Sequence, residues 1–222
     1  MKTDKTEIKS LTGAGNGKSN MTYRLVLASI LAAISILLMY FETSIPFMPP
    51  FLKLDISEIP ALFGAFSLGP GAAVLIVLVK NIFHLPTSGT AYVGELANFL
   101  AGAAFAGTAG LIFRKMQGRK GAVIAMASGT VAMTIFTSLF NYFFMIDFYA
   151  GLFGTTMEQI VAMTAALNSM VSDLRTLVVF AFVPFNIFKG VLVSAITGLL
   201  FWRLEPVLRR SRDRLDVRKE RS

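Results

Sequence analysis

The chain has 222 residues, of which 55% are hydrophobic and 15% are charged, whereas roughly 25% of the residues of soluble domains are charged. Its mean hydropathy is +0.65, and its apolar runs are long enough to cross the roughly 30 Å hydrocarbon layer of a bilayer. These values exclude an ordinary soluble protein and indicate an integral membrane protein. The sequence has no cysteine and one histidine, His84, which excludes disulfides, cysteine-metal sites and multi-histidine metal sites.

The net charge of +8 comes from basic residues that gather in three short segments beside apolar runs. Residues 1–24 hold five Lys or Arg, residues 114–120 hold four and residues 203–222 hold eight, of 21 in the chain. Cytoplasmic loops of membrane proteins carry such an excess of basic residues. The pattern therefore predicts that all three segments lie on the cytoplasmic side, near anionic lipid, and it argues against a nucleic-acid partner.

Five apolar segments lie between two polar ends of the chain. The first 20 residues are polar, and we expect residues 1–20 to form a flexible cytoplasmic tail. Residues 204–222 are expected to form a basic cytoplasmic tail, and residues 21–203 the membrane domain. The apolar segments of this domain are 24–41, 59–85, 92–113, 121–146 and 176–202.

The second apolar segment decides how often the chain crosses the membrane. As a single span, 59–85 would give five crossings and place the N-terminal tail opposite both other basic segments, against the charge rule. The sequence Gly69-Pro70-Gly71 interrupts it, because proline removes a helix hydrogen bond, and predicts two short helices at about 58–68 and 71–85. We therefore expect an all-α membrane protein: a six-transmembrane-helix bundle with a broken second/third helix pair and with both termini cytoplasmic. In transporters, broken helices are a sign of a ligand site.

Small residues recur at helical spacing in two of the apolar segments. The first segment carries the pair Ala28 and Ala32, and the segment 92–113 is rich in alanine and glycine. Small residues four positions apart let helices approach closely in lipid. In the segment 92–113 this favours packing inside the chain, whereas for Ala28 and Ala32 both internal packing and docking onto another membrane protein stay open.

Polar side chains inside apolar segments are the strongest signals of a functional site. Lys189 lies in the middle of its segment, where insertion of a lysine costs about 2.5–3.5 kcal/mol, and Asn186 shares its helix face. Further polar side chains near the outer ends of the segments are Glu42, Glu95, Asn98 and Asn141. In a closed bundle these groups would point toward one outward-facing cavity. The alternatives are an internal ion pair of Lys189 with Glu42 or Glu95, hydrogen bonds between helices for the asparagines, and a structural Lys80 whose ammonium group reaches toward the membrane surface.

Two long connections on the expected outer side could cap such a cavity. Residues 42–55 contain three prolines. Residues 157–170, in the connection 147–175, have helical periodicity and could lie in the membrane interface.

The sequence offers no constellation for enzyme catalysis. It contains no glycine-rich phosphate loop, so we expect no ATP hydrolysis by the chain itself. Its single histidine has no nearby nucleophile, which argues against a Ser-His-Asp arrangement. We therefore expect that the protein is not an enzyme.

Four sequence blocks, in this order, carry a resemblance to a known family. They are "PFMPPFLKLDISEIPALFGAFSLGPGAAVLIVLVKN", "GELANFLAGAAFAG", "LFNYFFMIDFY" and "VPFNIFKGV". Over about residues 21–203 the chain resembles the riboflavin-specific substrate-binding (S) components of energy-coupling factor (ECF) vitamin transporters. The resemblance implies a six-helix bundle in the cell membrane that captures riboflavin from outside as a transported ligand, not as a cofactor. It also implies association with a transmembrane T component and two cytoplasmic ATPases; an S component for another vitamin and a stand-alone facilitator are the alternatives.

The resemblance also implies roles for individual residues. The ligand-contacting asparagine of the fifth span corresponds to Asn141, and the asparagine and lysine of the last span correspond to Asn186 and Lys189. The small-residue pair that faces the T component falls on Ala28 and Ala32. An acidic ligand contact falls on Glu42, and the first outer loop lines the pocket around Leu52, Lys53 and Leu54.

Overall fold

The computed structural model describes residues 5–45, 48, 52–89, 92–145, 148, 151, 154 and 156–220, and the side chains of those between 21 and 203. Its long helices are α1 (Lys5–Met39), α3 (Pro70–His84), α4 (Val93–Lys115), α5 (Gly118–Phe140) and α9 (Val183–Glu220). Shorter helices are α2 (Glu58–Ser67), α7 (Met157–Ala165), α8 (Leu174–Leu177), the 3₁₀ turn η1 (Leu85–Thr87) and the π-helical turns η2 (Asn141–Met145) and η3 (Val178–Phe182). Two short strands, β1 (Thr43–Ser44) and β2 (Lys53–Leu54), pair antiparallel, with Thr43 opposite Leu54.

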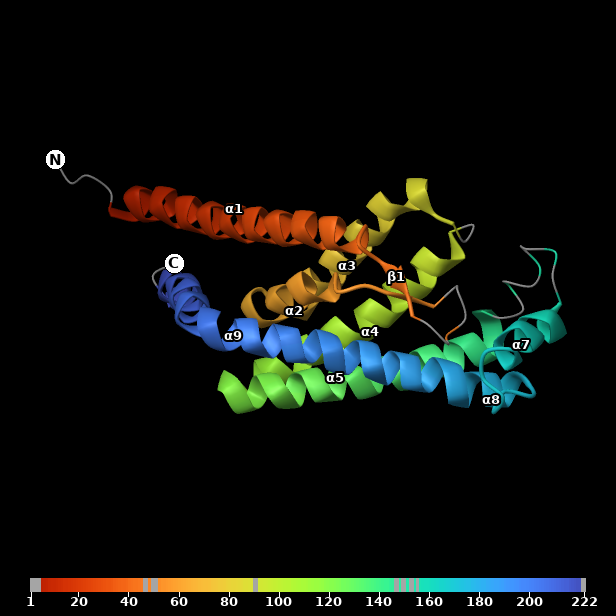
Figure 1. Cartoon of the computed structure of the whole chain (residues 1–222). Helices are drawn as coiled ribbons and strands as arrows, with labels where there is room; N and C mark the ends of the chain where they lie inside the picture. Colours follow the sequence, from red (N-terminus) through yellow and green to blue (C-terminus); the bar gives the residue numbers. More distant parts are fainter. Residues whose placement is uncertain are drawn as a thin grey trace.

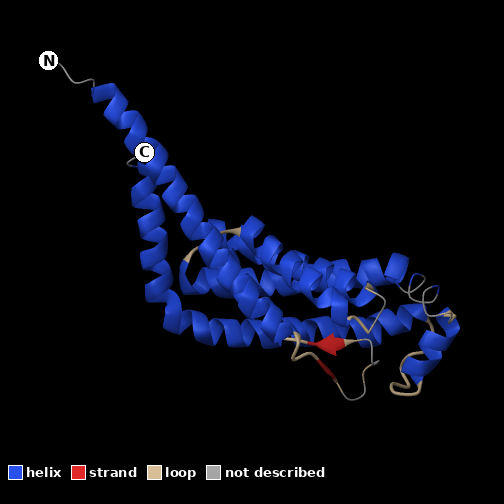
Figure 2. Ribbon diagram, turned by 90° about the horizontal axis from the view of Figure 1, so that it is seen from above, coloured by secondary structure: helices blue, strands red, loops and turns tan. Residues whose placement is uncertain are grey.

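The helices form one bundle with all of its connections at two ends (Figure 1). The beginning of α1, the turn between α2 and α3, the turn between α4 and α5 and the end of α9 lie at one end. The paired strands, α7 and α8 lie at the other end. Figure 2, a view from above, also places the beginning of α1 and the end of α9 at the same end of the molecule.

Five helical segments of the described chain are long and apolar enough to cross a membrane. They are Met21–Met39, Pro70–Thr87, Val93–Lys115, Gly118–Phe144 and Leu174–Arg203. The expectation of a helical membrane protein is thereby confirmed. Helix α2 has only 10 residues and is not among the five, so the count of six crossings stays a prediction.

The apolar stretch 59–85 is interrupted where Gly69 precedes Pro70. Helix α2 ends at Ser67, and α3 starts at Pro70, which occupies the first turn where a missing backbone N–H costs nothing. Between them, Gly69 has φ = 98°, a conformation that side chains with a Cβ rarely adopt. A Cβ at Gly64 of α2 would come within 2.5 Å of the Ile76 side chain of α3, so the two short helices pack closely back to back.

Small residues bring α3, α4 and α5 into direct backbone contact. Ala106 and Ala109 of α4 and Ala125 of α5 are completely buried, as expected for packing inside the chain. Gly129 of α5 lies against the backbone of Phe105, where an added Cβ would come within 2.6 Å of the carbonyl oxygen. These contacts build the main core of the bundle.

The small-residue pair of α1 also packs against this chain. Ala32 is buried and belongs to the main core, and Ala28 is half-buried. Internal packing therefore accounts for Ala32 in this structure, and contact of the pair with a partner stays a prediction. Helix α1 starts at Lys5 and α9 continues to Glu220; the division into tails and membrane domain at residues 20 and 203 also stays a prediction.

A second, smaller core caps the bundle at the end that carries the strands. Leu52 packs there with buried residues from the α8 to α9 region, namely Val171, Leu177, Val178, Ala181, Phe182 and Phe185. Helix α7, which lies within the periodic stretch 157–170, contributes Met157, Ile160 and Val161. The segment before α2 and the segment before α9 therefore fold together over the same end of the bundle.

The close approach of α4 and α5 predicts a position that is intolerant of even one methyl group. Gly129→Ala places its Cβ against backbone atoms that cannot rotate away, and overpacking of this kind costs roughly 1–3 kcal/mol. We expect a lower midpoint of thermal unfolding for the detergent-purified variant. Gly107→Ala is the matched control, because its nearest new neighbour is a Val74 methyl group at 3.4 Å; equal midpoints for the two variants would contradict the packing.

Candidate ligand-binding site

A cavity opens between the ends of α1, α4, α5 and α9 and the segment that contains β2. Its lining residues are Met39, Glu42, Leu52, Lys53, Gly94, Glu95, Ala97, Asn98, Ala101, Thr137, Asn141, Phe182, Phe185, Asn186 and Lys189. The volume of this cavity is about 100 Å³, or about 790 Å³ when the adjoining space that is open to solvent is included.

The structure brings together eight of the nine ligand-binding residues expected from the sequence. Those at the cavity are Glu42, Leu52, Lys53, Glu95, Asn98, Asn141, Asn186 and Lys189. The exception is Leu54, which packs against the second core instead. The cavity also has two aromatic residues that the sequence analysis did not single out, Phe182 and Phe185.

The amide groups of Asn141 and Asn186 are oriented by their own helices. The amide nitrogen of Asn141 donates to the carbonyl oxygen of Thr137 at 2.7 Å, and that of Asn186 donates to Phe182 at 2.8 Å. Each bond involves a residue of a π-helical turn, since the donor Asn141 is the first residue of η2 and the acceptor Phe182 is the last residue of η3. Because only the NH₂ group can donate to a carbonyl, these bonds fix which atoms of each amide remain for other partners.

Lys189 forms an ion pair with two carboxylates from the segment before and at the start of α2. Its ammonium nitrogen lies 2.8 Å from Asp55 Oδ2 and 3.4 Å from Glu58 Oε2. The alternative partners expected from the sequence, Glu42 and Glu95, are therefore wrong. The reason is that the chain folds back after β2 and carries Asp55 into the interior, whereas Glu42 and Glu95 remain at the cavity mouth with other partners.

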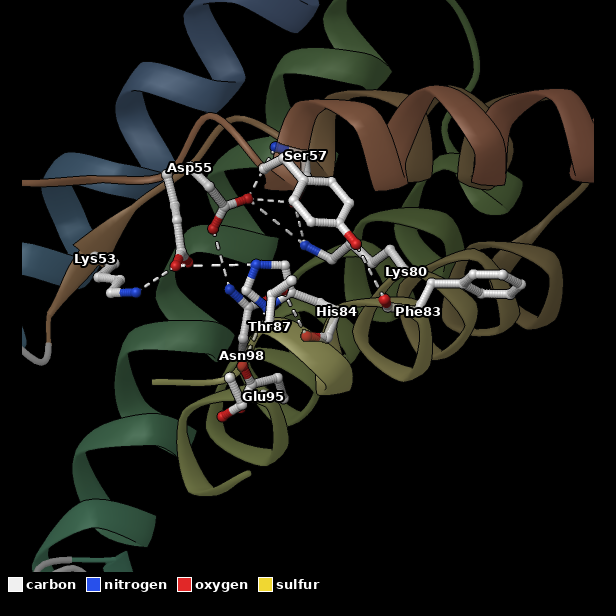
Figure 3. A network of polar contacts seen from close by, with 12 residues as sticks. Lys53, Asp55, Ser57, Lys80, Phe83, His84, Thr87, Glu95 and Asn98 are labelled. Atoms are coloured by element: carbon white, nitrogen blue, oxygen red, sulfur yellow. Dashed lines mark hydrogen bonds and ion pairs between the residues drawn. The ribbon is translucent and has the colours of Figure 1, made fainter. Parts of the chain in front are cut away.

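Lys80 of α3 belongs to the same buried cluster. Its ammonium group donates to Glu58 Oε1 at 2.7 Å. It also donates to Ser57 Oγ and lies 3.7 Å from Asp55 Oδ1 (Figure 3). The Lys80 side chain is completely buried, so the expectation that it reaches toward the membrane surface is wrong. A buried ammonium group is tolerated where carboxylates neutralise it, and here Asp55 and Glu58 do so.

Burial by itself would raise the pKa of the Asp55 carboxyl. The ammonium groups of Lys189 and Lys80, together with hydrogen bonds from Lys189 and Ser57, outweigh that effect and hold the pKa well below its usual range. Asp55 is therefore an ionised acceptor.

A second polar cluster surrounds the cavity mouth. Glu42 forms an ion pair with Lys53 of β2, and Glu95 Oε1 lies 3.0 Å from Nδ1 of His84. The other ring nitrogen of His84 lies 3.9 Å from Glu42, and the ring stacks at a tilt on Tyr40. These contacts tie the end of α1 to the ends of α3 and α4, and Figure 3 shows them beside the Asp55 cluster.

Comparison with known proteins assigns the family. The model of the "ECF transporter, substrate-specific component" family matches residues 23–201. The chain belongs to this family.

Three similar proteins illustrate the relationship of this S component to others. "Riboflavin transporter RibU" of Staphylococcus aureus (strain TCH60) is 36% identical over 198 residues, covering 88% of this chain and 98% of that protein. "Riboflavin transporter FmnP" of Bacillus subtilis (strain 168) is 31% identical over 192 residues, covering 85% and 95%. The solved structure reported as "Structure and mechanism of the S component of a bacterial ECF transporter" is 34% identical, has a TM-score of 0.69 and covers 85% of this chain and 98% of that one.

In this S component, sequence reasoning missed the residues behind the cavity wall. Asp55, Ser57 and Glu58 do not line the cavity, yet they bond to Lys189, Asn98 and Lys80. A usable signal was present: two lysines within apolar segments need two carboxylates, and the stretch "LDISE" supplies two within four residues.

Neutralising one member of the buried cluster should destabilise the S component. Lys80→Met leaves the carboxylate of Glu58 without its closest cation, and breaking a buried pair typically costs about 3–5 kcal/mol. The variant Lys80→Met with Glu58→Gln should recover part of that loss, because both charges are gone. Thermal unfolding in detergent measures both effects.

The matched control for this prediction is Lys53→Met. Its pair with Glu42 is partly exposed, since the Lys53 side chain retains 36% of its accessible surface, and pairs of this kind contribute about 0–1 kcal/mol. Equal destabilisation by Lys80→Met and Lys53→Met would show that burial does not make the cluster critical.

Proposed function

We propose that this S component is the membrane-embedded riboflavin-binding subunit of an ECF-type importer, which captures the vitamin from outside. The observation that carries the proposal is the cavity itself, in which eight residues expected to contact riboflavin lie together. The printed names of the two relatives described above, both riboflavin transporters, point to the same ligand.

The chemistry of the cavity suits a flavin. Riboflavin has an apolar tricyclic ring, a uracil-like polar edge and a ribityl chain with hydroxyl groups. Phe182 and Phe185 offer flat apolar surfaces for the ring. Asn141 and Asn186 carry donors and acceptors for the polar edge, and Lys189 has further ammonium hydrogens for a carbonyl or hydroxyl oxygen. Leaving such buried groups unpaired is costly, so a site of this kind rejects ligands that lack the matching groups.

The proposed import cycle requires partners. In the proposal, a transmembrane T component and two cytoplasmic ATPases supply the energy, since the chain has no phosphate-binding loop of its own. The T component would contact α1 near Ala28, which is half-buried, and the adjoining exposed apolar residues Leu25 and Val26.

The proposed topology is six crossings, with α2 and α3 counted as two, in the cell membrane. Both tails, 1–20 and 204–222, would lie in the cytoplasm and flank the membrane domain, 21–203. Two observations support this: α2 and α3 are separate helices that pack back to back, and the beginning of α1 lies at the same end of the bundle as the end of α9 (Figure 1).

Riboflavin binding is tested directly with the detergent-purified protein. Riboflavin fluorescence should be quenched on titration with protein, and Asn186→Ala or Asn141→Ala should each weaken binding by about 1–3 kcal/mol, because a ligand group loses its buried partner. Ser194→Ala, on the same helix as Asn186 but away from the cavity, should leave the affinity unchanged.

Stripped protein that shows no riboflavin binding at micromolar concentrations would refute the proposal. Competition by other vitamins in the same assay separates it from the alternative of an S component with a different ligand. A stand-alone facilitator is excluded if uptake into vesicles requires the ATPases and ATP.

The topology can be tested by cysteine labelling, because the chain has no cysteine of its own. We expect Ser10→Cys and Gln117→Cys to be protected from a membrane-impermeant maleimide in intact cells and to react after permeabilisation. Met170→Cys, in an exposed outer connection, should react in both cases. With five crossings, Ser10 and Gln117 would lie on opposite sides, so labelling of only one of them in intact cells would refute six crossings.

A further inference from the structure

Asp55 binds two residues of the cavity wall without lining the cavity itself. Its Oδ2 accepts from Lys189 Nζ of α9 at 2.8 Å and from Asn98 Nδ2 of α4 at 3.0 Å. The carboxyl group is buried, with an exposed fraction of 2% for the residue. A single oxygen atom therefore links two helices that are far apart in the sequence, behind the cavity wall; Figure 3 shows its bond to Asn98.

The Asp55 carboxylate is itself held in place. Its Oδ1 accepts from the backbone N–H of Ser57 at 2.9 Å and from the Ser57 hydroxyl group. The Ser57 hydroxyl in turn accepts from Lys80, and the Ser57 carbonyl accepts from the hydroxyl of Ser35 on α1. The segment before α2, helix α4 and helix α9 thus each supply a donor to the carboxylate, which holds it in one orientation.

This arrangement decides which atoms Asn98 and Lys189 can offer to a ligand. An ionised carboxylate only accepts hydrogen bonds, so Asn98 must turn its NH₂ group toward Asp55 and its carbonyl oxygen away. Within the described residues, that Asn98 oxygen is buried and has no hydrogen-bond partner. A buried acceptor without a partner is costly, and a donating ligand group would remove that cost.

We propose that Asp55 is a positioning residue for the ligand, which fixes Asn98 as an acceptor and Lys189 as a donor in the cavity wall. The proposal rests on the proposed riboflavin-binding function. It assigns to this part of the cavity a ligand edge that carries a hydrogen-bond donor beside an acceptor, as the uracil-like edge and the ribityl hydroxyls of riboflavin do.

Glu58 does not share this role, although it belongs to the same cluster. Its closest contact is Lys80 at 2.7 Å, whereas Lys189 lies at 3.4 Å. No hydrogen bond between Glu58 and Asn98 is found in the described part of the chain. Glu58 therefore mainly neutralises charge, and it offers a comparison that separates charge from positioning.

The test is a double-mutant cycle on riboflavin affinity, measured by fluorescence quenching with the full-length protein in detergent. Asp55→Asn is nearly isosteric but removes the acceptor charge, so Asn98 is free to turn over and Lys189 to move toward Glu58. We expect Asp55→Asn to weaken binding by about tenfold or more, as for loss of a charge-assisted hydrogen bond. In a Lys189→Met background the same change should weaken binding by less than about threefold, because its main target is gone.

Glu58→Gln is the matched comparison, since it removes one buried carboxylate charge from the same cluster. The fold-loss of riboflavin affinity in Glu58→Gln should be at least about threefold smaller than that in Asp55→Asn. Equal losses for the two variants, or full additivity of Asp55→Asn with Lys189→Met, would overturn the positioning role and leave Asp55 as a structural charge.

Two further measurements keep the outcomes separate. If Asp55→Asn does not fold, Ser57→Ala is used instead, because it keeps all four charges and removes one donor from Asp55. Ser57→Ala alone should weaken binding a few-fold, whereas it should have no effect in the Lys189→Met background. An unchanged affinity in the Ser57→Ala single variant would refute the proposal. Absence of riboflavin binding by the wild-type protein refutes the proposed function itself, whereas wild-type binding with unchanged affinity in Asp55→Asn refutes only the role of Asp55.

Discussion

The structure depends on a buried cluster of two ammonium groups and two carboxylates. Lys80 and Lys189 would each be costly inside an apolar bundle, and so would Asp55 and Glu58, but together they are neutral and within ion-pair distance. Because the charges come from α2, α3, α9 and the segment after β2, they can neutralise one another only when these elements are assembled. The cluster therefore ties α2 to the centre of the bundle, although this helix is too short to be anchored by a full membrane crossing.

Irregular backbone places the polar groups of the cavity where regular helices would not. The π-helical turns η2 and η3 contain Asn141 and Phe182, and the break at Gly69 gives α2 its separate direction. Within a membrane, irregular backbone is tolerated where protein or a cavity covers the freed groups. In this S component the π-helical turns coincide with the cavity, so fold and site share the same departures from regularity.

The sequence could predict the helices and most of the cavity, because both follow from local pattern and resemblance. Lys189 and Asn186 share a face by spacing alone, and the break before Pro70 is a property of proline. The partner of Lys189 could not be predicted, since Asp55 lies 134 residues away in the chain and meets it only through the path of the segment after β2. Leu54 is the converse case: alternation along β2 turns it toward the second core while its neighbour Lys53 reaches the cavity mouth.

The charge balance of the cavity also bears on the proposed ligand. Both lysines of the lining already have carboxylate partners, Lys53 with Glu42 and Lys189 with Asp55 and Glu58. An anionic ligand would have to displace one of these carboxylates or leave its own charge unbalanced, which is costly away from water. A neutral ligand with many hydrogen-bonding groups displaces no carboxylate and brings no charge that must be balanced. Because riboflavin is uncharged, it can use the donors of Lys189 and the acceptor of Asn98 while the buried ion pairs that hold the bundle together stay intact.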